Sequence, residues 1–147
     1  MSYEVERIVI TNWIRGREFF GLCSFGLDGG ISTMVNESGW MNLLPGNAAQ
    51  ISVGSPGANL HQYVGVLAIT IITEGVLGSG PGRVFADTVI DAFTGLKLDE
   101  RGDVVAAGAT TVIDFARAGV PYIADSTPIP PFHQTVVNCP YTRTERK

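Results

Sequence analysis

The stretch from Gln62 to Thr73 predicts a strand with two apolar faces. With a period of two, both sets of side chains are almost entirely glycine, alanine, valine, leucine and isoleucine. An antiparallel strand with one wet face should instead alternate apolar and polar residues. We therefore expect both faces of this strand to be covered.

Two segments predict helices. In residues 2–15 apolar side chains recur at helical spacing, with Ser2 as a cap and Gly16 as a stop. The β-branched run in this segment favours a strand, but strict alternation is absent, so we expect a helix. A turn over 78–82 leads into the second helix, which has Pro81 in its first turn and stops at Gly95. Its predicted apolar face is Phe85, Val89, Ala92 and Phe93.

The remaining chain predicts short extended pieces separated by turns. We expect strands at 20–25, 40–44, 49–53, 110–118 and 132–139, and a weaker one at 104–106 within a connector over 96–108. Turns are predicted at 27–30 and 55–57. Residues 119–131 hold four of the eight prolines and predict a loop, and Pro140 indicates that the last strand lies at an edge or ends there.

This order of elements predicts one α+β domain over residues 1–147, an antiparallel or mixed β-sheet with two main helices packed on one face. Two helices of this length cover only one face of a sheet. The second apolar face of the 62–73 strand then needs another partner. We infer that the chain associates with copies of itself.

Composition narrows the functional classes. Of 147 residues, 45% are hydrophobic and only 16% charged, below the roughly 25% usual in soluble domains, which fits a surface partly covered by other subunits. A net charge of −4 with scattered basic residues disfavours nucleic-acid readout. The N-terminal residues do not resemble a signal peptide, and no run of about 18 apolar residues predicts a membrane span. Cys23 and Cys139 lack metal or redox spacing and fit a reducing cytosol.

Three stretches together resemble the tail-terminator (tail-completion) proteins of long-tailed bacteriophages. They are WMNLLPGNAAQISVG at 40–54, QYVGVLAITIITEGVLGSGPGRVFADTVIDAF at 62–93, and a loop leading to an extended end near Tyr141 and Arg143. The second is similar to the family's aromatic-x-Gly strand, followed by a Gly-rich turn and a helix closing on phenylalanine. Residues 19–39 depart from the pattern, because a glycine-rich segment stands where a proline-containing one is expected.

The resemblance implies a ring-forming virion subunit, hexameric in relatives, assembled in the host cytoplasm. Such a ring caps the tail tube, ends its polymerisation and joins the tail to head-side neck or connector proteins. No enzymatic activity, cofactor or metal is expected, and the genome would pass through the lumen without specific binding. Loops at 54–61 and 123–131 would order on docking. The candidate ring or tube contacts are Trp40, Gln50, Ser52, Ser55, Asn59, His61, Val64, Val66, Asp125 and Ser126.

Chemical motifs are weak by comparison. The Gly78–Gly82 turn lies where phosphate loops lie, but it lacks the Lys-Ser/Thr of a P-loop, so a tight strand-to-helix turn is the preferred interpretation. Asp87 and Asp91 share a helix face, yet two carboxylates are too few for a hard cation, and Arg83 is a ready partner.

Three alternatives to a tail terminator remain open. One is another neck, head-completion or minor tail protein. The second is a small soluble enzyme that uses His61, His133 and Asp114, although no nucleophile motif accompanies them. The third is a channel protein that contacts DNA, which the net negative charge disfavours.

Overall fold

A computed structural model describes residues 3–27, 35–50, 60–99, 113–116 and 119–146 of the chain. The chain forms a mixed sheet with two α-helices and two 3₁₀ turns. The elements in chain order are α1 (Tyr3–Gly16), η1 (Glu18–Gly21), β1 (Ser24–Gly26), β2 (Ser38–Gln50), β3 (Leu60–Glu74), η2 (Gly75–Leu77), α2 (Gly80–Phe93), β4 (Lys97–Leu98), β5 (Ile113–Asp114), β6 (Tyr122–Ile129) and β7 (Phe132–Arg146).

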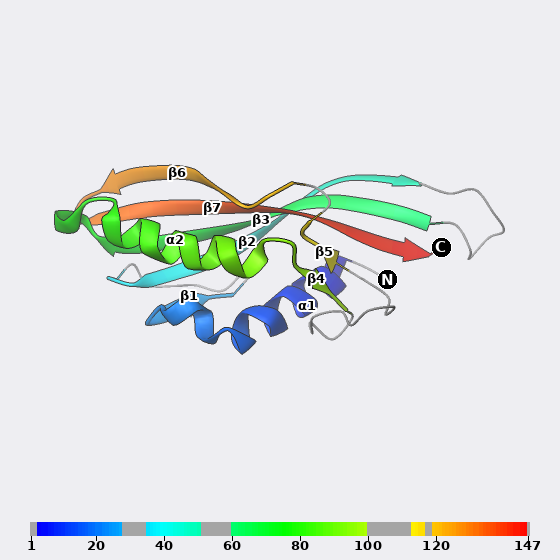
Figure 1. The fold of residues 1–147 in the computed structure, drawn as a ribbon, viewed down its shortest axis with the longest axis horizontal. Helices are drawn as coiled ribbons and strands as arrows, with labels where there is room; N and C mark the ends of the chain where they lie inside the picture. The colour runs from blue at the N-terminus through cyan, green and yellow to red at the C-terminus, as the bar shows by residue number, and fades with distance from the viewer. Residues whose placement is uncertain (1–2, 28–34, 51–59, 100–112, 117–118, 147) are drawn as a thin grey trace.

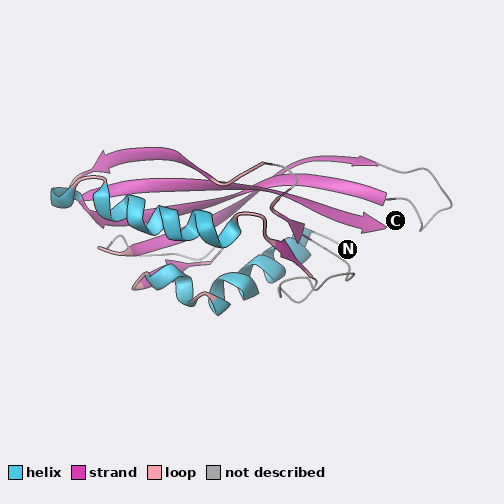
Figure 2. Cartoon of the chain, viewed as in Figure 1, coloured by secondary structure: helices cyan, strands magenta, loops and turns pink. Residues whose placement is uncertain are grey.

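The sheet is built around two long antiparallel strands. β3 and β7 pair over their whole length, from Leu60↔Arg146 to Glu74↔Phe132. The strand order is β1-β2-β3-β7-β5-β4, and β6 pairs with the first half of β7. Among the strands that the structure describes, only the β1–β2 pair is parallel, so the sheet is mixed (Figures 1 and 2).

Both α-helices pack on the same face of this sheet. The buried core joins residues of α1 and α2 to alternate residues of β3 and β7, such as Leu67, Ile69, Val137 and Cys139. Figure 1 shows α2 lying along β3 and β7, with α1 beside it. The predicted α+β fold with two helices on one face is therefore confirmed.

The two predicted helices form where the apolar spacing placed them. On α1, Val9, Ile10 and Ile14 are fully buried, as 3.6-residue periodicity requires. On α2, Val89 and Phe93 are fully buried, whereas Phe85 and Ala92 are partly buried. Pro81 lies in the first turn of α2, and Gly95 follows the helix with a φ of +67°, which favours glycine.

The predicted loop at 119–131 is wrong, because most of it forms β6 (Tyr122–Ile129). Among the described residues β6 pairs only with β7, so it is an edge strand. Proline lacks a backbone N–H, and an edge strand tolerates this at Pro128. Pro130 and Pro131 make the turn into β7, and Pro121 precedes the strand. The prolines are thus confined to an edge strand and its ends, where they remove no essential ladder bond.

The predicted strand at 20–25 is also largely wrong. The chain instead makes the 3₁₀ turn η1, and β1 covers only Ser24–Gly26. Four consecutive residues, Glu18 to Gly21, have positive φ, a conformation that is costly outside glycine. The turn inserts Phe20 between Phe25 and Phe93, with ring centroids 6.2 and 5.9 Å away, and this burial stabilises the strained backbone.

Three strand boundaries differ from expectation. The extended piece predicted at 40–44 and the described start of the one predicted at 49–53 belong to one strand, β2, which ends at Gln50 and whose register shifts between Pro45 and Ala48. Of the strand predicted at 110–118, Ile113–Asp114 is extended and 115–116 is a bend. β7 runs past Pro140 to Arg146, and Pro140 lies between the residues that pair with β6 and those that pair with β5. The turn expected at 55–57 and the strand expected at 104–106 lie outside the described residues, as do most of the turn expected at 27–30 and residues 51–53.

Candidate interaction surfaces

The sheet face opposite the helices carries partly exposed apolar side chains, with the polar Asn42 and Asn138 among them. It is formed by residues of β2, β3, β7 and β6 that are neighbours across the paired strands. Leu44 is 54% exposed, Tyr122 50% and Val64 41%. We call this surface the open face: Trp40, Leu44, Val64, Val66, Ala68, Tyr122, Val136 and Pro140.

The open face follows from the two-sided apolar pattern of β3. Odd-numbered residues from Tyr63 to Thr73 point under the helices and are buried, whereas Val64, Val66 and Ala68 lie on the other side. Thr70 and Ile72 on that side are buried, so the exposed apolar residues of that side are confined to the half of β3 nearer its start. The expectation that both faces are covered therefore fails for this half within the single chain, because both described α-helices pack on the other side.

Three of the predicted contact residues meet on this surface. Trp40, Val64 and Val66 belong to the open face, and Asp125 lies at its margin, on the same side of the sheet as Val136. Asp125 accepts a hydrogen bond from Thr127, at 2.7 Å. The structure thus brings together residues that are up to 85 positions apart in the chain.

The other predicted contact residues are not part of this group. Gln50 pairs with His61 at the far end of the β2–β3 ladder, and His61 lies on the side of the sheet that bears the helices. Ser126 also lies on the helix side, where its hydroxyl is 2.8 Å from Nε2 of His133. Ser52, Ser55 and Asn59 fall outside the described residues.

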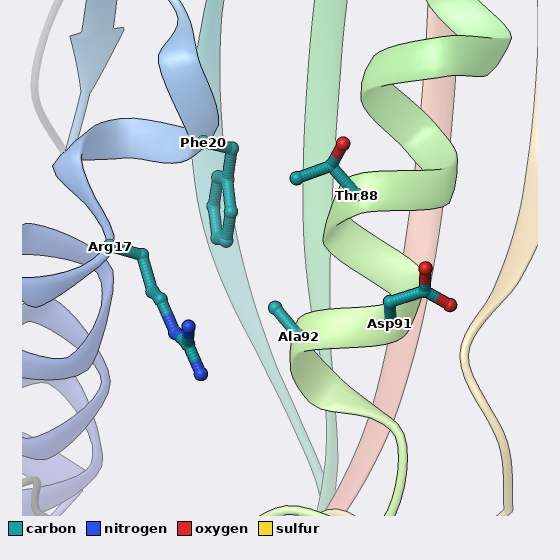
Figure 3. Close-up of a pocket in the computed structure, with 5 residues that line it drawn as sticks. All are labelled: Arg17, Phe20, Thr88, Asp91 and Ala92. Carbon is teal, nitrogen blue, oxygen red and sulfur yellow. The ribbon is translucent and has the colours of Figure 1, made fainter.

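A second candidate surface is a pocket of about 420 Å³ between η1 and α2. Arg17 and Phe20 line one side, and Thr88, Asp91 and Ala92 of α2 line the other. Figure 3 shows the Phe20 ring facing Thr88 and Ala92, while the Asp91 carboxylate is directed away from Arg17. The pocket therefore has an apolar floor and a rim that carries one positive and one negative charge.

The floor of this pocket is held by the strained turn. Phe20 is 6% exposed and its ring touches Phe93 at the end of α2. The Arg17 guanidinium lies over the Trp13 ring at 4.5 Å, a cation–π contact that holds it at the rim. The pocket is thus shaped before any ligand binds. The sequence carried no signal for it, because the positive φ values depend on tertiary packing.

A buried charge cluster links α1 to the end of β7. Glu6 accepts a hydrogen bond from Nε of Arg143 at 2.9 Å and one from the Tyr141 hydroxyl at 2.6 Å. Arg143 is also stacked over the Tyr63 ring at 4.0 Å. Glu6 and Arg143 are both at most 2% exposed. Because solvent is excluded, each charge depends on the protein for its partners, so the cluster fixes α1 against the sheet.

The residues considered for catalysis are far apart. His61 and His133 lie at opposite ends of the β3–β7 ladder, about 40 Å apart at 3.3 Å per residue. Asp114 accepts a hydrogen bond from the backbone of Ala116 and is paired with Thr142 near the other end of β7. His133 does contact Ser126, but no acid that would orient the imidazole is described beside it.

The cysteines and acidic residues give no metal site among the described residues. Burial raises the pKa of the Cys139 thiol to about 12. The exposed Cys23 thiol donates a hydrogen bond to Glu37, which raises its pKa as well. Asp87 and Asp91 are exposed on α2, as expected of a solvated helix face. In the part of the chain that the structure describes, no helix has the length and apolar character to span a bilayer.

Comparison with known proteins supports the fold. No family model and no curated protein sequence matches the chain. A solved structure whose name is only a sequence identifier is similar to it, with a TM-score of 0.66 and 15% identity over 97% of this chain and 96% of the other. At this level of identity the likeness concerns the fold alone.

Proposed function

We propose that this protein is a structural subunit of a long-tailed bacteriophage particle, a tail terminator that forms a ring on the tail tube. The ring ends polymerisation of the tube and presents a docking surface to head-side neck proteins. The ordered resemblance at 40–54, 62–93 and the C-terminal strand supports this function. The fold agrees with the small α+β subunit that the resemblance implies.

The observation that carries the proposal is the open face. Folded monomers rarely expose large contiguous apolar patches, and such patches mark interaction sites. Here the exposed side chains of Leu44, Val64 and Tyr122 share one sheet face, and both described α-helices pack on the other. Burying this face on a neighbouring subunit or on the tube would recover about 25 cal/mol per Å² of apolar surface.

The function requires contact and shape rather than chemistry. The low charged fraction of the chain limits electrostatic repulsion between stacked rings. The long β3–β7 pair and the buried Glu6–Arg143 contact give the subunit a rigid frame. A rigid subunit suits a ring that must match a tube of fixed geometry.

Light scattering on the purified protein tests the proposal. We expect the native chain to form rings at micromolar concentration, visible with a central hole by negative-stain electron microscopy. Val64→Asp places a charge on the open face and should weaken association at least tenfold. Ile8→Asp is the matched control, because Ile8 is similarly exposed at 44% but lies on α1. A native protein that stays monomeric would contradict the proposal.

Loss of the gene in the phage separates the terminator from other neck proteins. Without a terminator, tubes should grow beyond their normal length. Headless tails of normal length would instead indicate a head-completion or other neck role.

A further inference from the structure

We infer that successive copies in the ring are joined by an apolar tip on one copy that inserts into the Phe20 pocket of the next. The tip consists of Val76, Ile129, Pro130 and Pro131, and the pocket is the one between η1 and α2. This inference rests on the proposed ring and adds, beside the open face, a second contact between successive copies.

The tip is an apolar protrusion whose backbone is held in place by a hydrogen bond. Val76, in η2, is 90% exposed, and Ile129 beside the β6–β7 turn is 36% exposed. The Gly75 amide donates a 2.9 Å hydrogen bond to the Pro131 carbonyl, which fixes η2 against that turn. A Cβ at Gly75 would lie 2.7 Å from the same carbonyl oxygen, so the approach requires glycine. Such rigidity lowers the entropic cost of docking.

The pocket has the size and chemistry to receive this tip. Its volume of about 420 Å³ is larger than one valine side chain, so the flanking backbone or a proline ring can enter too. The Phe20 ring and the Ala92 methyl provide the apolar contact. Aromatic pockets that receive a single apolar anchor are typical of the energetically dominant centre of an interface.

Charges on the two surfaces are complementary. The tip end of the molecule carries exposed Glu74 and Arg83, and the pocket rim carries exposed Arg17 and Asp91. None of these four side chains has an ion pair within the described residues. Docking can therefore set Glu74 opposite Arg17 and Arg83 opposite Asp91. This pairing favours a second copy of the same chain over an uncharged apolar partner.

The positions of the tip and the pocket make the contact head-to-tail. Val76 of the tip lies four residues before the start of α2, and Thr88, Asp91 and Ala92 of the pocket lie in the second half of this helix. Eight residues of helix from Gly80 to Thr88 alone span about 12 Å. A copy cannot fill its own pocket with its own tip, and a heterologous contact of this kind closes into a ring when the rotation allows.

Cross-linking tests the contact directly. In a Cys23→Ser background, Val76→Cys with Thr88→Cys should give, on mild oxidation, a ladder of covalent multimers that ends at the ring number. Within one copy the two residues are too far apart for a disulfide, which needs Cα atoms within about 7 Å. Val120→Cys with Thr88→Cys is the control, since Val120 is 69% exposed but lies away from the tip. It should give no ladder.

A charge exchange provides an independent readout. Arg17→Glu should weaken association at least tenfold, and Glu74→Arg in the same chain should restore it. If Arg17→Glu acted only by removing the contact between Arg17 and Trp13, Glu74→Arg would not restore association, because Glu74 lies at the other end of α2. Rings that persist without the tip–pocket cross-link or without charge rescue would overturn this inference alone. A native protein that is monomeric would overturn the proposed function as well.

Discussion

The buried pair between Glu6 and Arg143 allows a quantitative test of what holds α1 to the sheet. Arg143→Met removes the guanidinium and leaves the Glu6 carboxylate, 2% exposed, with the Tyr141 hydroxyl as its remaining described partner. Breaking one side of a buried ion pair costs about 3–5 kcal/mol. For a domain of this size about 1 kcal/mol shifts Tm by roughly 3 °C, so Tm should fall by roughly 9–15 °C.

The double variant Glu6→Gln, Arg143→Met supplies the control. It removes the unpaired negative charge, so it should be more stable than Arg143→Met alone by at least about 1.5 kcal/mol. Urea unfolding followed by circular dichroism measures all the variants. If the double variant is as unstable as Arg143→Met, an uncompensated carboxylate is not the source of the loss and the reasoning is refuted.

Four further outcomes follow from buried side chains and from the two cysteines. Gly65→Ala should cost about 1–3 kcal/mol in thermal unfolding, because its Cβ would lie 2.6 Å from Oη of Tyr141; an unchanged Tm would contradict this. Thr135→Val should raise stability by about 1 kcal/mol, since the buried hydroxyl has no hydrogen-bond partner among the described residues, and a loss in urea unfolding would show a missed partner. The Cys139 thiol, with its pKa raised to about 12, stays protonated in the folded state. In the unfolded chain the pKa of a cysteine thiol is about 8.5. Stability should therefore be unaffected by this group below about pH 8 and fall as pH rises from about 9 towards 12, by less in Cys139→Ala. At pH 8 a thiol reagent should label the exposed Cys23 in the folded protein, and the buried Cys139 only in urea.

Local signals were sufficient for the helices and the central strand. The spacing of Val9 and Trp13, and the Pro81 and Gly95 boundaries, determine α1 and α2 without reference to the rest of the chain. The two-sided pattern of β3 also predicted an apolar second face, and the structure has one around Val64. These features depend on residues close together in sequence.

The features that sequence reasoning missed depend on strand pairing and side-chain packing rather than on the preferences of the residues themselves. β6 contains Pro128, and three more prolines lie just before or after the strand, so its sequence is typical of a loop. Its extended structure is evident only from its pairing with β7. The positive φ values at Glu18, Phe19 and Phe20 have no local cause, since glycine comes only at the end of the turn. They result from burying Phe20 against Phe93, so the pocket could not be predicted either.

The position of β7 in the sheet has a consequence for biosynthesis. The strand that pairs with β3, β5 and β6 is translated after all three of them, and the Glu6–Arg143 contact joins residues 137 positions apart. Until the ribosome has released this stretch, the nascent polypeptide lacks the strand that the rest of the sheet surrounds. We expect products that stop before β7 to remain unfolded and be degraded, so that only copies that contain β7 accumulate in folded form.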